Sequence, residues 1–254
     1  MIECKNLFGG YALAKILQDV SLTFSDAQLT VIVGPNGCGK STLLKLCSKQ
    51  LPFAKGEVNV DRESLSALSR KQLSQKIALL PQSRPIPDIT VGALVLHGRF
   101  PWLNYPRIYC LEDKQIAENA MKKMGIFSQR QQLLSHLSGG QRQKVYLAML
   151  LAQDTKNILL DEPTTYLDIV HQLELLEFLK ECKREGKTVV VVLHDLRMAL
   201  ENAEQVVVMK GGRVLVAGTA EEVEHSGAIE KAFGVEVLRR EQVGFCLRKG
   251  FSNR

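Results

Sequence analysis

The sequence predicts an α/β fold in which helices cover both faces of a parallel β-sheet. Short uncharged runs rich in leucine and β-branched residues alternate with helical patterns, which is typical of buried parallel strands. These runs span residues 29–33, 77–80, 158–160 and 188–193. A glycine-rich loop follows the first run, and polar or charged side chains follow the other three. We therefore expect the functional residues to gather at the carboxyl edge of this sheet.

Length and composition are those of a globular protein with a full hydrophobic core. The chain has 254 residues, of which 45% are apolar and 24% charged, and this excludes disordered and fibrous classes. The formal charge of +6 suits a membrane surface or nucleotide phosphates, and equally an ordinary mixed-charge surface. The first residues lack the apolar core of a signal peptide, and the apolar runs are too short to span a bilayer. We expect a cytosolic protein with reduced thiols, because its six cysteines include no CxxC pair.

The first elements follow from local patterns. Residues 2–25 alternate between apolar and polar side chains, so we expect antiparallel strands that pack beside the main sheet. The run at 29–33 predicts a central strand, and the glycine-rich loop after it should lead into a helix that begins near Lys40.

Residues 83–155 differ in character and predict a helical insert. Prolines break the chain soon after the strand at 77–80. The apolar residues Ile116, Ala120 and Met124 then recur at intervals of four, which indicates a helix over 112–124 that ends at Gly125. A second helix is expected over 140–152.

The last elements carry turn and capping signals. Gly211 and Gly212 lie between two apolar runs, at 206–209 and 214–217, and predict a two-residue β-hairpin. Thr219, with glutamate three residues later, predicts the capped start of another helix. Residues 235–254 are expected to add further strands, with no function assigned.

The glycine-rich loop matches the phosphate-loop pattern and lies between a strand and a helix, as that pattern requires. Its residues are Gly34, Pro35, Asn36, Gly37, Cys38, Gly39, Lys40 and Ser41. The glycines let backbone N–H groups approach a phosphate, Lys40 supplies a positive charge, and the Ser41 hydroxyl can bind Mg²⁺. Cys38 is either a reactive thiol whose pKa the helix N-terminus lowers or a small tolerated residue.

Three further strands end in groups suited to hydrolysis. Asp161 and Glu162 follow the strand at 158–160, where Asp161 can help to hold Mg²⁺ and Glu162 can polarise a water. Gln82 and His194 follow two other strands. Each of these is an ordinary surface residue when considered alone, but together with the phosphate loop they predict a hydrolytic centre.

The segment Leu137-Ser-Gly-Gly-Gln141 has two interpretations. Ser138 and Gln141 form a capping box for the following helix. The same exposed, glycine-flanked helix N-terminus can also bind phosphate. Since the chain already has a complete phosphate loop, the second interpretation places this segment on the ATP of a second copy.

The order of these motifs, with Tyr166-Leu-Asp168 after the carboxylates, resembles the nucleotide-binding subunits of ABC transporters over nearly the whole chain. The resemblance implies a P-loop NTPase core with a parallel sheet, an N-terminal antiparallel β subdomain and a helical insert. It implies one ABC ATPase domain over residues 1–254. In that domain 1–82 and 156–254 form the ATP-binding core, and 83–155 form a helical subdomain that carries the signature motif.

The resemblance also implies a role for each site residue. Glu162 resembles the general base, His194 the switch histidine, and Tyr11 the aromatic residue that stacks on adenine. The residues that would hold ATP within the chain are Gly34, Asn36, Gly37, Cys38, Gly39, Lys40, Ser41 and Thr42. The residues that would hold Mg²⁺ are Ser41, Gln82 and Asp161, with Gln82 also sensing the permease. The residues that would contact ATP across the dimer are Ser138, Gly139, Gly140, Gln141 and Asp168.

Finer features resemble the importers of ferric siderophores, with haem and cobalamin importers as alternatives. These features are Asp88-Ile-Thr-Val, Gly98-Arg-Phe-Pro101 and the pair His171-Gln172. The resemblance implies an ATP-dependent homodimer at the cytoplasmic face of the membrane. It would bind membrane permease subunits and work indirectly with an extracytoplasmic binding protein, without nucleic acid.

Two other functional classes remain open. One is a soluble ABC-type ATPase that acts on DNA or ribosomes, although such proteins generally carry coiled-coil insertions or two cassettes in one chain. The other is a nucleotide kinase, which would leave the signature segment and His194 without a role.

Overall fold

The computed structural model describes residues 1–11, 14–84, 86–165 and 167–237. Its centre is a six-stranded sheet in the order β10-β9-β3-β8-β7-β6, in which β10 is antiparallel to β9 and the other neighbours are parallel. The strands are β3 (Leu29–Val33), β6 (Ile77–Leu80), β7 (Asn157–Asp161), β8 (Thr188–Val192), β9 (Gln205–Lys210) and β10 (Arg213–Gly218). The α/β class and the four expected parallel strands are confirmed.

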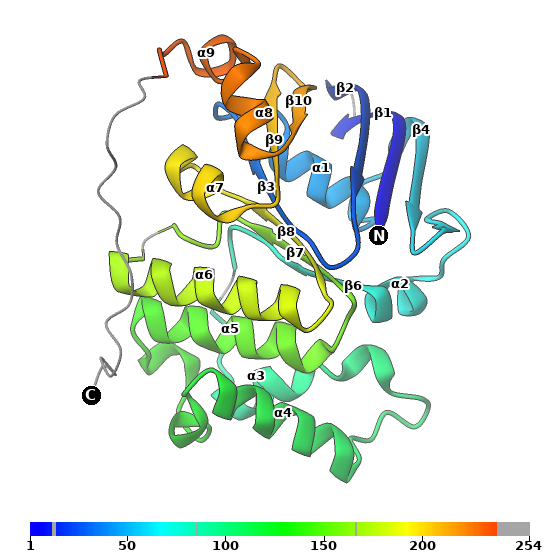
Figure 1. The fold of residues 1–254 in the computed structure, drawn as a ribbon. Coiled ribbons are helices and arrows are strands. Elements are labelled where there is room, and N and C mark those ends of the chain that lie inside the picture. Colours follow the sequence, from blue (N-terminus) through cyan, green and yellow to red (C-terminus); the bar gives the residue numbers. More distant parts are fainter. Residues whose placement is uncertain (12–13, 85, 166, 238–254) are drawn as a thin grey trace.

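A second, antiparallel sheet lies beside the first, in the order β2-β1-β4-β5 (Figure 1). Its strands are β1 (Ile2–Tyr11), β2 (Ala14–Phe24), β4 (Phe53–Val60) and β5 (Glu63–Ser64). The expected antiparallel strands in 2–25 are therefore present, and two later strands join them.

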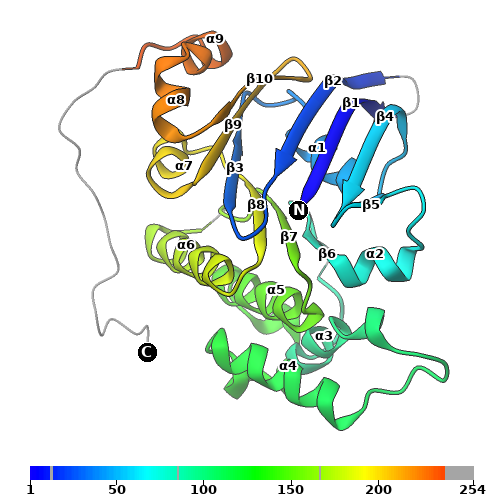
Figure 2. The same cartoon turned by 45° about the vertical axis from the view of Figure 1, so that its right-hand side comes forward.

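The helices connect the strands of the central sheet and cover it. The α-helices are α1 (Lys40–Cys47), α2 (Arg70–Lys76), α3 (Val91–His97), α4 (Leu111–Lys123), α5 (Gly139–Gln153), α6 (Ile169–Arg184), α7 (Leu196–Asn202), α8 (Ala220–His225) and α9 (Ala228–Phe233). Short 3₁₀ helices are η1 (Phe100–Trp102), η2 (Phe127–Gln129) and η3 (Leu134–His136). Helices α3 and α4 lie at the far end of the molecule from α8 and α9 (Figure 2).

Local chemistry explains where several elements begin and end. Helix α4 ends just before Gly125, whose φ of 68° is the left-handed conformation that glycine adopts readily. Gly211 and Gly212, with φ of 53° and 77°, form the two-residue turn between β9 and β10, as expected. Thr219 caps α8 with the expected capping box.

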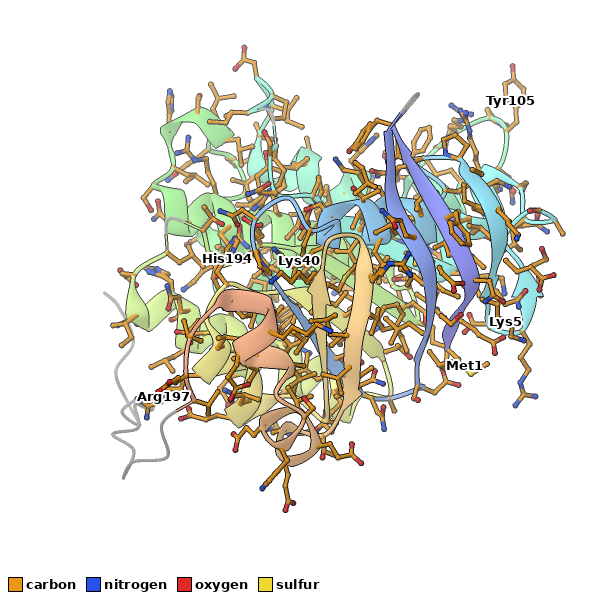
Figure 3. All side chains as sticks on the ribbon, turned by 90° about the horizontal axis from the view of Figure 1, so that it is seen from above. Met1, Lys5, Lys40, Tyr105, His194 and Arg197 are labelled. Atoms are coloured by element: carbon orange, nitrogen blue, oxygen red, sulfur yellow. The ribbon has the colours of Figure 1, made fainter. Side chains whose placement is uncertain are left out.

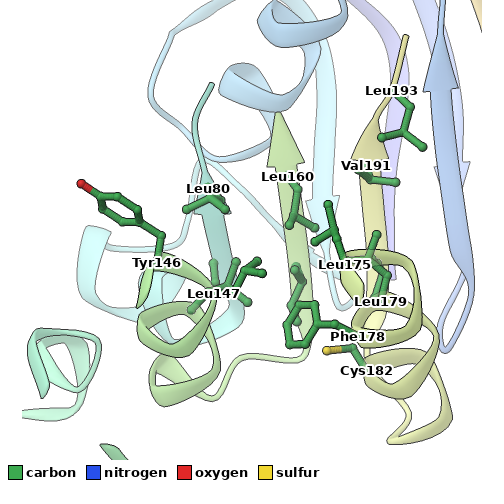
Figure 4. Close-up of a cluster of buried hydrophobic side chains, with 14 of the residues drawn as sticks. Leu80, Tyr146, Leu147, Leu160, Leu175, Phe178, Leu179, Cys182, Val191 and Leu193 are labelled. Atoms are coloured by element: carbon green, nitrogen blue, oxygen red, sulfur yellow. The ribbon is translucent and has the colours of Figure 1, made fainter. Parts of the chain in front are cut away.

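Successive residues of the central strands enter two hydrophobic cores. In β3, Val31 packs with α5 and α6, and Ile32 packs with α1 and the antiparallel sheet. Figure 4 shows the first core, in which Leu160 and Val191 lie against Leu175 and Leu179 of α6 (Figure 4). All five residues of β3, β7 and β8 are buried, so the register of these strands is strongly specified. The sheet is therefore a rigid base for the residues at its carboxyl edge.

No helix among the described residues is long and apolar enough to cross a membrane. Five of the cysteines fall in the described residues, and all five are free thiols there. Most of the C-terminal segment expected to form strands, residues 238–254, lies outside the described residues, as does Tyr166.

Candidate functional site

The phosphate loop folds around the amino group of Lys40. The Lys40 side chain is buried, and its Nζ donates to the carbonyl oxygens of Gly34 at 2.7 Å and Pro35 at 3.1 Å. Gly37 and Gly39 adopt φ of 75° and 106°, where a side chain would strain the backbone. The loop thus encloses a positive charge at the start of α1, where backbone N–H groups also point outward.

Ser41 and Asp161 pair across the gap between α1 and the end of β7. The Ser41 hydroxyl donates to Asp161 Oδ1 at 2.8 Å, and the Asp161 side chain is buried. Burial raises the pKa of Asp161, and the hydrogen bond from Ser41 acts in the opposite direction. A buried carboxylate beside a hydroxyl offers the hard oxygen ligands that Mg²⁺ prefers, so these residues fit that ion.

Glu162 is held by two side chains from neighbouring strands. Gln82 Nε2 donates to one carboxylate oxygen, and His194 Nε2 lies 2.8 Å from the other. This convergence follows from the register, because Leu80 pairs with Leu160, and Asp161 pairs with Val192. The expected gathering of these side chains at one edge of the sheet is present.

The backbone of Glu162 is itself unusual. Its φ of 48° is left-handed, a conformation that non-glycine residues adopt uncommonly and that is enriched at functional sites. The Glu162 carbonyl accepts bonds from the backbone N–H and hydroxyl of Thr165, which close the turn after β7. This turn aims the carboxylate at Gln82 and His194. His194 and Lys40, which come from different elements, fall in the same region of the view in Figure 3.

Tyr11 lies on β1 beside the phosphate-loop helix. Its ring is 44% exposed, and its hydroxyl accepts a hydrogen bond from Lys45 Nζ at 2.9 Å. An exposed ring in this position is available for stacking. In the phosphate loop Asn36 is exposed, whereas Thr42 is buried in α1.

The segment that opens α5 is exposed at the helix N-terminus. Ser138 and Gln141 form a complete capping box, with the Ser138 N–H donating to Gln141 Oε1 at 2.9 Å. A Cβ built on Gly139 would meet no atom within 4 Å, so this glycine faces open space. The capping interpretation is confirmed, and the motif leaves its backbone free on the outer side.

Asp168 caps the next helix, α6. Its Oδ1 accepts from the His171 N–H at 2.9 Å and lies 2.7 Å from His171 Nδ1. These bonds, first the one from the backbone N–H, lower the pKa of Asp168. The structure therefore does not bring Asp168 or the segment 138–141 to Glu162 in the way that it brings Gln82 and His194.

Gln143 is not identified from the sequence, and of the two interpretations of Cys38 the structure favours the small tolerated residue. Gln143 is buried on α5, and its Nε2 donates to the carbonyl of Pro163 at 3.0 Å, tying α5 to the turn after Glu162. An amide next to apolar residues of this helix is the signal that could have found it. Burial raises the pKa of the Cys38 thiol instead of lowering it, which favours the interpretation as a small tolerated residue.

The chain matches the family model described as ABC transporter over residues 17–165. The ferric enterobactin transport ATP-binding protein FepC of Escherichia coli is 39% identical, over 90% of this chain and 85% of that protein. The iron(3+)-hydroxamate import ATP-binding protein FhuC of Bacillus subtilis is 38% identical, over 89% and 85%. The hemin import ATP-binding protein HmuV of Rhodococcus jostii is 36% identical, over 91% and 80%.

Two solved structures share the fold at 26% identity. One is an ABC transporter described as metal-chelate type, in an inward-facing conformation, with a TM-score of 0.81 over 92% of this chain and 89% of that one. The other is cbiO1 of Clostridium perfringens, part of the transporter complex cbiONQ, with a TM-score of 0.77 over 91% and 92%.

Proposed function

This chain belongs to the ABC transporter family, and from that membership we propose that it is the ATP-hydrolysing subunit of a ferric-siderophore importer. The observation that carries the proposal is the convergence of Lys40, Ser41 and Asp161 with the Gln82–Glu162–His194 group. A phosphate-binding loop and a held carboxylate at one edge of a sheet are what nucleotide hydrolysis needs.

Each residue of the hydrolytic centre would have its own role in ATP hydrolysis. Lys40 and the loop N–H groups would bind the β- and γ-phosphates, and Tyr11 would stack on the adenine. Glu162 would act as the general base on the attacking water, held in place by Gln82 and His194. Bound Mg²⁺, held by Ser41 and Asp161 with Gln82 nearby, would neutralise phosphate charge.

The signature segment supports a homodimer. Ser138 and Gly139 are exposed, a Cβ on Gly139 would face open space, and Asp168 at the start of α6 is exposed as well. An exposed helix N-terminus that can bind phosphate would suit the ATP held by a second copy, because the phosphate loop already serves the chain's own ATP. Two chains would then close around two ATP molecules, and hydrolysis would reopen them.

The transport partners follow from the relatives. Because the matched proteins are transport and import subunits, we infer that this chain docks on permease subunits at the cytoplasmic face of the membrane. The helical subdomain at residues 83–155 would make that contact, next to the site residue Gln82. An extracytoplasmic binding protein would deliver the cargo to the permease, without contact to this chain.

Ferric siderophore is the favoured cargo, and haem is the main competitor. Relatives named for enterobactin and hydroxamate match at 39% and 38% identity, and the hemin relative matches at 36%. Cobalamin remains a further alternative from sequence resemblance.

The test compares uptake of labelled ferric siderophores, haem and cobalamin in cells that carry the wild-type protein or Lys40→Ala. Since Lys40 supplies the charge of the phosphate loop, we expect siderophore uptake to fail in the variant and the other two to persist. Failure of haem or cobalamin uptake instead would reject the siderophore assignment and keep the ATPase. Normal ATP hydrolysis by purified Lys40→Ala would reject the site itself.

A further inference from the structure

His171 lies between Asp168, the N-cap of α6, and the first turn of α5. It belongs to α6, and it contacts Asp168 on one side and the signature glycine Gly140 of α5 on the other. We propose that His171 is a positioning residue that joins Asp168 to the signature segment, so that both act as one unit on the ATP of a second copy. This inference rests on the proposed function.

The contact with Asp168 uses both donors that His171 can offer on that side. The backbone N–H donates at 2.9 Å, and Nδ1 lies 2.7 Å from the same carboxylate oxygen, Oδ1. One oxygen is thus held by two groups of one residue, and the backbone N–H of Val170 also interacts with this carboxylate. Asp168 itself is largely exposed, with 65% of its side chain accessible, so without the ring its carboxylate would be held by backbone N–H groups alone.

The contact with Gly140 is a close packing of ring against backbone. A Cβ built on Gly140 would lie 2.8 Å from His171 Nε2 and 3.1 Å from both ring carbons beside it. Since Nε2 is the ring atom nearest to this Cβ and the two carbons beside it are equally distant, the imidazole points its Nε2 corner at Gly140. A side chain at position 140 would therefore have to displace the His171 ring, quite apart from any contact with phosphate.

The surroundings leave the ring little freedom. The cavity between α5 and α6 beside the ring has a volume of about 20 Å³, room for about one water molecule. On the same two helices, Lys144 and Glu174 form an ion pair of 2.9 Å one turn further along. The ring of His171, which belongs to α6, thus packs against α5. A shift of α5 would move the ring and, through it, Asp168.

This arrangement predicts that changes at His171 lower the rate of ATP turnover without weakening ATP binding within the chain. The phosphate loop at Gly34–Ser41 makes no contact with His171, so binding within the chain should be unaffected by changes there. The groups that His171 positions would act only on the partner's ATP, so their misplacement should lower kcat. A displacement of the order of 1 Å at a catalytic group can lower a rate by about 100-fold.

The first experiment measures steady-state ATPase of the purified full chain for His171→Ala and His171→Asn. For His171→Ala we expect kcat to fall about 10-fold or more, with KM for ATP within about twofold of wild type. Asparagine can place an amide donor near the position of Nδ1 and should recover most of kcat. His225→Ala, a change on the distant helix α8, is the matched control and should behave as wild type.

Two outcomes would overturn the proposal. One is a His171→Ala protein whose kcat stays within about twofold of wild type. The other is equal loss of kcat in the alanine and asparagine variants, because that would make the ring a packing element without a role through Asp168.

A second experiment tests the ring contact without relying on activity. Gly140→Ala should lower the melting temperature in the wild-type background, where the new methyl meets the imidazole. In a His171→Ala background the space of the imidazole is empty, so Gly140→Ala should lower the melting temperature much less. Equal shifts in both backgrounds would show that the ring does not pack on Gly140.

Failure of this inference can be told from failure of the proposed function by including Lys40→Ala. If wild type hydrolyses ATP, Lys40→Ala does not, and His171→Ala is fully active, only the positioning role is wrong. If the wild-type chain shows no ATPase above that of Lys40→Ala, the proposed function itself is wrong.

Discussion

Replacing Glu162 with glutamine should separate ATP binding from hydrolysis. The amide keeps the shape of the carboxylate and one acceptor oxygen, so it can still accept from Gln82 or meet His194. At most one charge-assisted hydrogen bond is lost, about 1–2 kcal/mol of folding free energy. The general base is removed completely, and kcat should fall by about 10²–10⁴, or roughly 3–5 kcal/mol in the barrier. The phosphate loop around Lys40 is unchanged, so ATP should bind as before.

The assay combines phosphate release with the size of the particle in solution. We expect Glu162→Gln to bind ATP with wild-type affinity and to accumulate as a dimer with ATP and Mg²⁺, because the step that reopens the dimer is blocked. Glu201→Gln, on the surface of α7, is the control and should turn over normally. A Glu162→Gln protein that hydrolyses ATP at a near-wild-type rate would refute the base assignment. One that remains monomeric with ATP and Mg²⁺ would refute the proposed cycle.

Three further changes test the structure around the site. Asp161→Asn should raise the melting temperature without Mg²⁺ while lowering ATPase, because burial raises the pKa of this carboxyl and its ionised form is unfavourable in the folded state. Asp113→Ala should lower the free energy of unfolding by about 3 kcal/mol, measured by urea titration, because it leaves the buried guanidinium of Arg99 without its 3.0 Å partner. Gly212→Ala should destabilise the chain by more than about 1 kcal/mol, since its new Cβ would collide with a backbone oxygen and its φ is positive. A side chain at position 211 would face open space, so Gly211→Asn should leave the free energy of unfolding nearly unchanged.

For each of these three substitutions we give a control variant or a result that would contradict the prediction. For Asp161 the raised pKa means that metal-free wild type gains stability as pH falls from neutral through that pKa, and Asp161→Asn should lack this gain. An identical pH profile in the two proteins would contradict the argument. For Asp113 the control is Glu118→Ala in the exposed ion pair with Lys122 on the same helix, where we expect a change below about 1 kcal/mol. Equal effects at Gly211 and Gly212 would contradict the turn geometry.

Elements with strong local patterns could be predicted well. The helix expected over 112–124 is α4, Leu111–Lys123, and the glycine pair between the last strands forms the hairpin turn. Helices α2, α3 and α7 have seven residues each, about two turns, which is too short for a clear periodic signal. Helix α6 is longer and was not anticipated, although Leu175, Leu179 and Cys182 lie at helical spacing on its buried face.

The sequence predicts the residues of the candidate site better than it predicts the contacts between them. Strand ends with polar residues predict a shared edge, and the parallel register puts Gln82, Glu162 and His194 together there. The thiol of Cys38 shows the limit of such reasoning. A helix N-terminus lowers a thiol pKa, but how deeply the thiol is buried is unknown until the loop is packed, and here burial prevails.

The phosphate loop, the capping boxes at Ser138 and Thr219 and the hairpin at Gly211 could all be predicted from local sequence, because caps and turns depend on neighbouring residues and their φ and ψ angles. The packing of the His171 ring on Gly140 and the hydrogen bond from Gln143 to the Pro163 carbonyl appear only in the folded chain. Such contacts depend on the packing of elements distant in sequence, and no local pattern encodes the distance between them.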